Sequence, residues 1–165
     1  MSQSARHTVA IRLHTQLDCL STILSRVPKD ALDRRPTPDK WSGRENLAHL
    51  ARYHQVFRDR IHRISTEDRP LLPRAEEDSE WQQWVGKPAD VLLEDLRALR
   101  EDMIGLFEGS SGAELMRTAL HSRFGEMTLL QWLEFFLLHE AHHLYVVMQR
   151  IRESPWPTRG MNEQG

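Results

Sequence analysis

Cysteine, lysine and long apolar runs are all scarce in this chain of 165 residues. Cys19 is the only cysteine, so no disulfide can form within the chain, and we expect a cytoplasmic protein. Nothing in the sequence marks Cys19 as an activated thiol, so we expect it to pack quietly on a helix. No run of about 18 apolar residues exists, and the polar N-terminus has no apolar signal core, so no membrane contact is expected.

An excess of positive charge is also missing. Lysines and arginines number 22 against 24 aspartates and glutamates, which gives a formal net charge of −2. A nucleic-acid partner is therefore not expected, because such proteins carry a basic surface. The hydrophobic share of 39% and the charged share of 28% are typical of globular proteins. We expect one domain over residues 1–153 and a flexible tail over residues 154–165.

Apolar residues recur in steps of three and four in four separate stretches, which is the spacing of helices in a bundle. The four predicted helices cover residues 4–27, 42–64, 88–108 and 128–152. Two of them open on a capping-box pattern, at Ser42–Glu45 and Thr128–Gln131. Two long connections join the later helices, with a short helix expected around Trp81 and Trp84. The predicted fold is therefore all-α, a four-helix bundle with two long crossover connections.

The last predicted helix carries three histidines within five residues. His139 and His143 are spaced so as to continue its apolar seam, in place of hydrocarbon. They lie one turn apart, with Cβ atoms about 5–6 Å from each other, so their rings can converge on one ion. A buried imidazole requires a hydrogen-bond partner or a metal. His142 flanks the seam and is expected to support the site rather than bind the ion.

A metal site of this kind needs a third ligand from another helix. Zinc and its divalent neighbours bind neutral imidazole, and catalytic sites usually combine three protein ligands with an open position. His49 and His54 flank the apolar stripe of the second helix on opposite sides, and geometry alone does not choose between them. His62, near the end of that helix, is a weaker candidate. The alternative is a set of core histidines held by hydrogen bonds alone.

Residues 139–143 also match the His-Glu-x-x-His pattern of zinc metalloproteases, in which Glu140 would be the general base. The extended form of that motif needs glycine and histidine where this chain has Val146 and Gln149. No strand pattern that could hold an extended peptide is found. We therefore interpret Glu140 as a solvated helix residue, and a protease is not favoured.

Three segments together resemble the DinB-like superfamily of metal-binding four-helix bundles, which includes the YfiT-like proteins. They are Trp-Ser-Gly-Arg-Glu-Asn-Leu-Ala-His-Leu (41–50), His-Ser-Arg-Phe-Gly-Glu-Met-Thr-Leu-Leu-Gln-Trp (121–132) and His-Glu-Ala-His-His-Leu (139–144). The resemblance spans nearly the whole chain. It implies a divalent-metal site of His49, His139 and His143 completed by water, and it selects His49 over His54. The chain departs from one common form of the last motif at Tyr145, since a glutamine often follows there.

The resemblance also implies a class of reaction. Characterised relatives include thiol-dependent transferases and isomerases that use bacillithiol, mycothiol or glutathione. We therefore expect a metal-dependent enzyme that transfers a low-molecular-weight thiol to a small electrophile, with zinc or nickel as its ion and a homodimer as its assembly. Two alternatives stay open. One is a non-catalytic metal-binding or stress-response module, and the other is a metal-dependent hydrolase with Glu140 or bound hydroxide as base.

Overall fold

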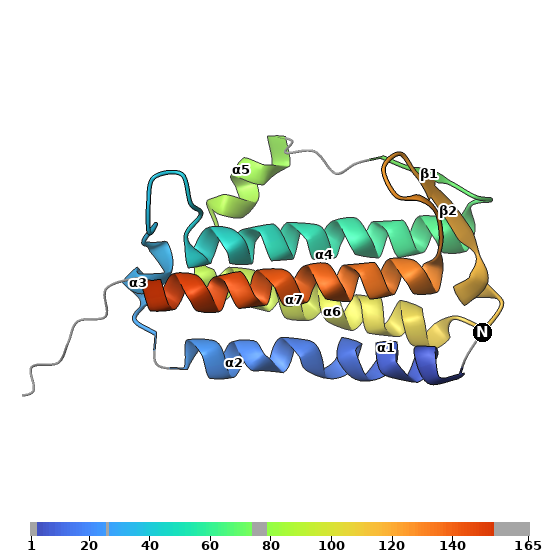
Figure 1. Cartoon of the computed structure of the whole chain (residues 1–165), viewed down its shortest axis with the longest axis horizontal. Helices are drawn as coiled ribbons and strands as arrows, with labels where there is room; N and C mark the ends of the chain where they lie inside the picture. The colour runs from blue at the N-terminus through green and yellow to red at the C-terminus, as the bar shows by residue number, and fades with distance from the viewer. Residues whose placement is uncertain (1–2, 26, 74–78, 154–165) are drawn as a thin grey trace, which may run out of the picture.

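Four long helical rods form the body of the molecule (Figure 1). The computed structural model describes residues 3–25, 27–73 and 79–153, so the predicted tail lies outside the described residues. The elements are α1 (Gln3–Thr15), η1 (Gln16–Asp18), α2 (Cys19–Leu24), α3 (Lys29–Asp33), α4 (Gly43–Thr66), β1 (Leu71–Leu72), α5 (Ser79–Val85), α6 (Ala89–Gly109), η2 (Glu114–Met116), β2 (Thr118–His121), β3 (Gly125–Thr128) and α7 (Leu129–Glu153). The predicted four-helix bundle is confirmed.

Both predicted capping boxes are present. The Ser42 hydroxyl accepts a hydrogen bond from the Glu45 backbone N–H at 3.1 Å, and the Glu45 carboxylate accepts one from the Ser42 N–H at 2.8 Å. Thr128 and Gln131 exchange the same pair of bonds at the start of α7. These bonds satisfy N–H groups that the helix itself leaves without partners, so they fix where α4 and α7 begin.

The two long connections differ in course. α4 and α6 run in one direction and α1 and α7 in the other, so the chain after α4 must return along the bundle (Figure 1). That return carries α5, which packs on α4 and confirms the short helix expected around the tryptophans. The connection from α6 to α7 stays at one end of the bundle.

A small sheet, which the sequence did not predict, joins the two long connections: the first contributes β1, and the second contributes β2 and β3. β2 pairs antiparallel with β3 and parallel with β1, with Leu71 opposite Leu120. Gly125 adopts a φ of 71° at the turn, a conformation that glycine reaches without steric cost. The strands are only two to four residues long, and one pairing joins segments about fifty residues apart, so no local period reveals them.

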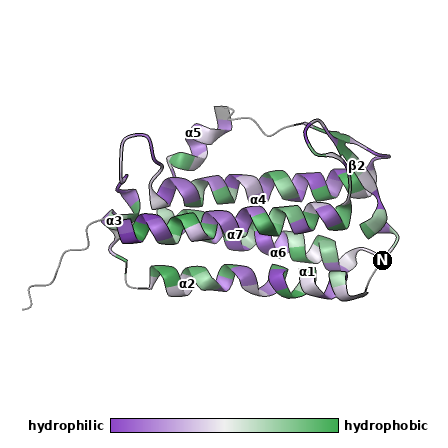
Figure 2. Cartoon of the chain, in the orientation of Figure 1, coloured by the Kyte–Doolittle hydropathy of each residue, from purple (hydrophilic) through white to green (hydrophobic). Residues whose placement is uncertain are grey.

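The core seam of α7 lies one residue away from the predicted one. Its buried positions follow steps of four and three through Leu133, Leu137, Glu140 and Leu144. His139 and His143 therefore sit on the flank of the seam and are partly exposed. The apolar pattern indicated the wrong seam because Glu140, a charged residue, occupies a core position. On α6, Arg100 likewise lies at a buried position, between Leu96 and Met103. Figure 2 shows hydrophilic and hydrophobic residues alternating along α4 and α7.

Among the described residues, none of the helices is both long and apolar enough to cross a lipid bilayer.

Candidate metal centre

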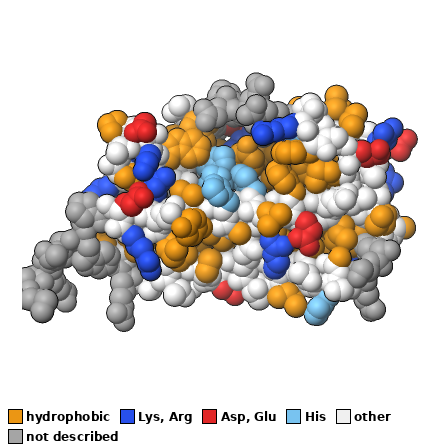
Figure 3. Space-filling view, in the orientation of Figure 1, with side chains coloured by type: hydrophobic (Ala, Val, Ile, Leu, Met, Phe, Trp, Pro, Cys, Tyr) orange, Lys and Arg blue, Asp and Glu red, His pale blue; other side chains and the backbone are white. Residues whose placement is uncertain are grey.

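Three histidines from two helices meet on one face of the bundle. α4 contributes His49, and α7 contributes His139 and His143; one ring nitrogen of each lies within 4.8 Å of the other two. Figure 3 shows histidine side chains gathered in the middle of the face formed by α4 and α7, with hydrophobic side chains around them. The structure thus brings together the three residues proposed as ligands, while binding of the ion itself stays a prediction.

The spacing of the ring nitrogens suits a small cation. The Nε2 atoms of His49 and His139 lie 3.3 Å apart. Two nitrogens bound to a tetrahedral zinc at about 2.0–2.1 Å are separated by roughly 3.4 Å. The other ring nitrogen of His139, Nδ1, is buried and has no hydrogen-bond partner among the described residues. In a hydrogen bond between His49 Nε2 and His139 Nε2, one nitrogen must carry a proton and only the other offers a lone pair. A cation between the rings binds the lone pairs of both nitrogens. The donor set therefore fits a divalent ion.

All three imidazoles are neutral at physiological pH. Burial lowers the pKa of His49, His139 and His143 to about 3, and the charge that each would place on the next ring adds to the shift. Only the neutral ring offers a lone pair to a metal. The site is thus held in its metal-binding protonation state.

Asn46 fixes the orientation of His143. The Asn46 side-chain amide donates from Nδ2 to the Ser42 carbonyl at 2.8 Å, which leaves its Oδ1 as an acceptor. That oxygen lies 3.2 Å from His143 Nδ1, so Nδ1 carries the proton and donates it to Asn46. Nε2 then keeps the free lone pair that can bind a metal ion. The sequence analysis missed Asn46, although it lies one helical turn before His49 on the same helix.

Aromatic rings border the triad. The Tyr53 ring lies 4.3 Å from the His49 ring and stacks on the His139 ring at 4.5 Å. On the other side, Trp41 lies 5.2 Å from His49 and stacks on Trp81 of α5 at 5.1 Å. The return connection therefore contributes directly to the site, because α5 supplies one of its walls. Walls of this kind suit an apolar or aromatic ligand.

The remaining candidate histidines lie elsewhere. His54 is fully buried in the bundle interior, where Nδ1 donates to the Leu50 carbonyl at 2.8 Å. His62 is exposed near the end of α4. His142 is exposed too, with its ring edge-on to His143 at 5.1 Å. The structure therefore separates His54, the residue that geometry alone left open, from the triad.

Glu140 is not the solvated residue that was predicted. It is fully buried, with Oε1 accepting from Gln16 at 2.7 Å and Oε2 accepting from Arg100 and, at 2.8 Å, from His54. Burial alone would raise the pKa of Glu140, but the hydrogen bond and charge of His54, and those of Arg100, outweigh it and lower the pKa to about 2. Both carboxylate oxygens of Glu140 already accept hydrogen bonds in the core. Glu140 therefore does not serve as a general base at the triad, and the match to the protease motif is coincidental.

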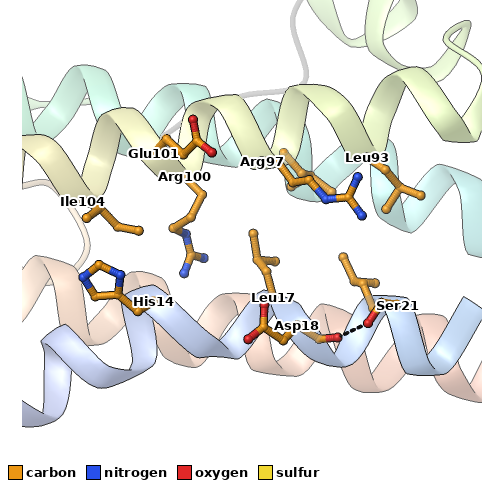
Figure 4. A pocket seen from close by; sticks show the side chains of 11 residues that line it. His14, Leu17, Asp18, Ser21, Leu93, Arg97, Arg100, Glu101 and Ile104 are labelled. Carbon is orange, nitrogen blue, oxygen red and sulfur yellow. Dashed lines mark hydrogen bonds between the residues drawn. The ribbon is translucent and has the colours of Figure 1, made fainter.

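A cavity of about 450 Å³ lies between α6 and the first helical rod, which consists of α1, η1 and α2. It lies away from the triad. Figure 4 shows Arg100 extending from α6 toward the helix that carries Leu17, whereas Arg97 runs along α6 toward Leu93. None of the three triad histidines lines it. Arg100 alone links the two regions, because it also binds Glu140, the neighbour of His139.

Cys19 is exposed, so the prediction that it packs on a neighbouring helix was wrong. Its thiol donates to the Gln16 carbonyl at 3.1 Å. Partial burial raises the pKa of Cys19, and the negative charge of Glu140 adds to this. The thiol is therefore not activated, as expected.

Comparison with known proteins identifies the family. The sequence profile of the DinB superfamily matches residues 12–147. The chain belongs to that superfamily. It is 23% identical, over 77% of its length and 74% of the relative's, to an Oceanobacillus iheyensis protein named "Putative metal-dependent hydrolase".

Two solved structures have the same fold. YfiT from Bacillus subtilis, described as "a probable metal-dependent hydrolase with an unusual four-helix bundle topology", matches with a TM-score of 0.81 and 19% identity, over 94% of this chain and 91% of its own. The DinB-like protein YjoA from Bacillus subtilis matches with a TM-score of 0.60 and 16% identity, over 88% of this chain and 91% of its own. At these identities the likeness establishes the bundle fold.

Proposed function

We propose that this protein is a metal-dependent enzyme that transfers a low-molecular-weight thiol to a small electrophile at the histidine triad. One observation carries the proposal. Three neutral imidazoles face one point beside solvent, and no fourth ligand from the described residues joins them. His49, His139 and His143 would hold a divalent ion and would leave a coordination position for substrate, which is the arrangement of catalytic rather than structural sites.

The surroundings favour a thiol over water as the nucleophile. A free thiol has a pKa of about 8.5 and water one of about 15.7, so a thiol ionises with far less assistance. A bound divalent ion supplies that assistance by lowering the pKa of a coordinated group. Water activation is commonly aided by a carboxylate base, but Glu140 is occupied in the core, and the described residues place no carboxylate within the triad.

The proposed reaction is a substitution. The thiolate sulfur attacks an electrophilic carbon, the new carbon–sulfur bond forms, and the leaving group departs with the electron pair of the bond that breaks. The proton of the thiol passes to solvent. The chain's residues hold the reactants in place, since Asn46 orients His143 while Trp41 and Tyr53 form apolar walls.

Turnover of chlorodinitrobenzene tests the proposal. Metal-free protein, and protein loaded with zinc or nickel, are each assayed with glutathione, bacillithiol and mycothiol, and product absorbance is followed. We expect turnover that needs both metal and thiol, that is lost in His139→Ala, and that persists in His142→Ala. Absence of metal-dependent turnover with every thiol overturns the proposal.

Hydrolysis is the second candidate. It is favoured by the names of the Oceanobacillus protein and of YfiT, which both refer to metal-dependent hydrolases. Metal-dependent cleavage of nitrophenyl acetate without any thiol would support it over thiol transfer. If neither reaction occurs, but chelation lowers the melting temperature markedly, the metal has only a stabilising role.

A further inference from the structure

One buried arginine lacks an opposite charge among the described residues. The buried charged side chains of the described residues are Glu45, Arg60, Arg100 and Glu140. Glu45 pairs with Arg35, and Arg100 pairs with Glu140. Arg60, 8% exposed, donates from Nη2 to the Pro73 carbonyl at 2.8 Å and has no carboxylate partner among the described residues. An unpaired buried charge is costly, so its retention calls for a reason.

Two further N–H donors lie near Arg60. Its guanidinium carbon lies 5.3 Å from the ring of Trp132, whose buried indole N–H also has no partner among the described residues. His121, next to Trp132, accepts at Nδ1 from the backbone N–H of Arg123 at 3.1 Å, so its proton lies on Nε2. Burial lowers the pKa of His121, and the charges of Arg60 and Arg123 add to this, so the two arginines act on the same ring. The region is therefore electropositive.

This region adjoins the histidine triad. His49, Tyr53, Phe57 and Arg60 follow one another at steps of four, four and three, on one face of α4. The Phe57 ring lies 5.3 Å from the Arg60 guanidinium carbon and 6.4 Å from the His139 ring. A single aromatic side chain thus separates the arginine from the triad, and these two distances place the Arg60 guanidinium carbon within about 12 Å of the His139 ring.

We propose that Arg60, with His121 beside it, binds the carboxylate of the small molecule that reacts at the histidine triad. The inference rests on the proposed function of the triad and adds the class of substrate. That substrate has a metal-binding or reactive atom at one end and a carboxylate on the order of 10 Å away. Its apolar middle contacts the partly exposed rings of Tyr53 and Phe135. A guanidinium recognises a carboxylate through paired, charge-assisted hydrogen bonds.

Packing explains part of this arrangement, because the Phe57 and Trp132 rings each lie 5.3 Å from the guanidinium carbon and offset part of the cost of burying its charge. The bond to the Pro73 carbonyl needs an N–H donor but not a positive charge, and a glutamine amide can supply one. Arg60→Gln therefore removes the charge while keeping a donor. Arg60→Lys keeps the charge but loses the planar guanidinium, whose paired N–H groups can bind both oxygens of a carboxylate. Arg58→Gln is the matched control, because Arg58 lies on the same helix and pairs with Asp59 and Asp102 instead.

The first measurement reads coordination at the triad directly. Cobalt-loaded protein is titrated with mercapto-octanoate and with mercapto-octanol, which differ only at the end remote from sulfur, and the sulfur-to-cobalt absorption band is followed. We expect the wild-type protein to bind the acid roughly ten- to a hundredfold more tightly than the alcohol. Arg60→Gln abolishes that preference, Arg60→Lys retains part of it, and Arg58→Gln leaves it unchanged. Equal affinity for the two thiols in the wild-type protein overturns the proposal.

The second measurement does not depend on the metal. Metal-free protein is titrated calorimetrically with phenylpropionate and with its uncharged amide; we expect the acid to bind more tightly, and the difference to vanish in Arg60→Gln. If cobalt shows no thiol band while this difference is found, thiol chemistry fails and the carboxylate site stands. If thiols coordinate but Arg60→Gln changes neither measurement, the carboxylate site fails and the proposed function stands. Circular dichroism verifies that each variant is folded.

Discussion

At the scale of the residue, two neighbours on α7 have opposite roles. His139 and Glu140 are separated by about 100° around the helix axis. This rotation turns His139 toward α4 and solvent, and it turns Glu140 into the core against Arg100. The imidazole stays neutral because burial lowers its pKa, and the carboxylate stays ionised because its partners outweigh the same burial. One position in the sequence thus separates a candidate metal ligand from a structural ion pair.

Loss of one triad histidine should abolish tight metal binding. His139→Ala or His143→Ala leaves two imidazoles, which hold a divalent ion far less firmly than three. His142→Ala should weaken binding less, because that ring is exposed and contacts only His143 edge-on. Elemental analysis after dialysis gives the metal content per chain. Equal loss from all three variants would show that the ligands are wrongly assigned.

Asn46→Ala should lower metal affinity roughly ten- to a hundredfold, the usual effect of removing a group that orients a ligand. The substitution frees His143 to rotate and to change the nitrogen that carries its proton. Asn46→Asp keeps an acceptor at the same place and should bind metal nearly as well as the wild-type protein. Competition with a chromogenic chelator measures both. An alanine variant with unchanged affinity would contradict the orienting role.

At the scale of the element, a polar network joins all four rods. Glu140 on α7 binds Gln16 of the first rod, His54 of α4 and Arg100 of α6, and Arg100 also donates to the Leu13 carbonyl of α1 at 2.8 Å. Because every rod takes part, the network ties the relative positions of α4 and α7, which carry the triad. Its bonds therefore contribute to the stability of the bundle.

Glu140→Gln should therefore act on stability rather than on metal binding. The change leaves the charge of Arg100 buried without its partner, and breaking a buried pair costs about 3–5 kcal/mol of unfolding free energy. The matched control is Glu134→Gln, also on α7, whose partly exposed pair with Arg12 should contribute about 0–1 kcal/mol. Urea denaturation measures both variants. Activity lost by Glu140→Gln without loss of stability would restore this residue as a catalytic base.

At the scale of the whole molecule, the four helices could be predicted because helical periodicity and capping are local signals. The meeting of His49 with His139 and His143 was implied only by the resemblance to the DinB-like superfamily. Reasoning from single residues left His49 and His54 equivalent, since both flank one apolar stripe. The structure separates them because His54 faces a carboxylate that no pattern placed in the core. Glu140 was misplaced for the same reason, because its partner Arg100 lies on another helix. A polar side chain is usually exposed, unless a partner on another helix offsets the cost of its burial. The sequence around the residue does not reveal that partner.

The stability of the metal-free protein should fall as the pH decreases below about 6.5. Each triad histidine has an ordinary pKa of 6.5 and a folded pKa of about 3, so the unfolded chain binds more protons between these values, and acid favours it. Glu140 adds to the loss at lower pH. Its folded pKa of about 2 lies below the ordinary 4.5, so its contribution is complete above 4.5 and disappears as the pH falls through 2.

Thermal melts from pH 8 to pH 4, with zinc and without it, measure this dependence. Zinc should move the onset of the loss to lower pH, because protons must then displace a bound cation. A variant combining His49→Gln, His139→Gln and His143→Gln should lose most of the dependence between pH 6.5 and 4.5, since glutamine does not titrate. The zinc effect should disappear with it. If the variant and the wild-type protein give the same profile, other groups control the acid response, and the three imidazoles are not held neutral by the fold.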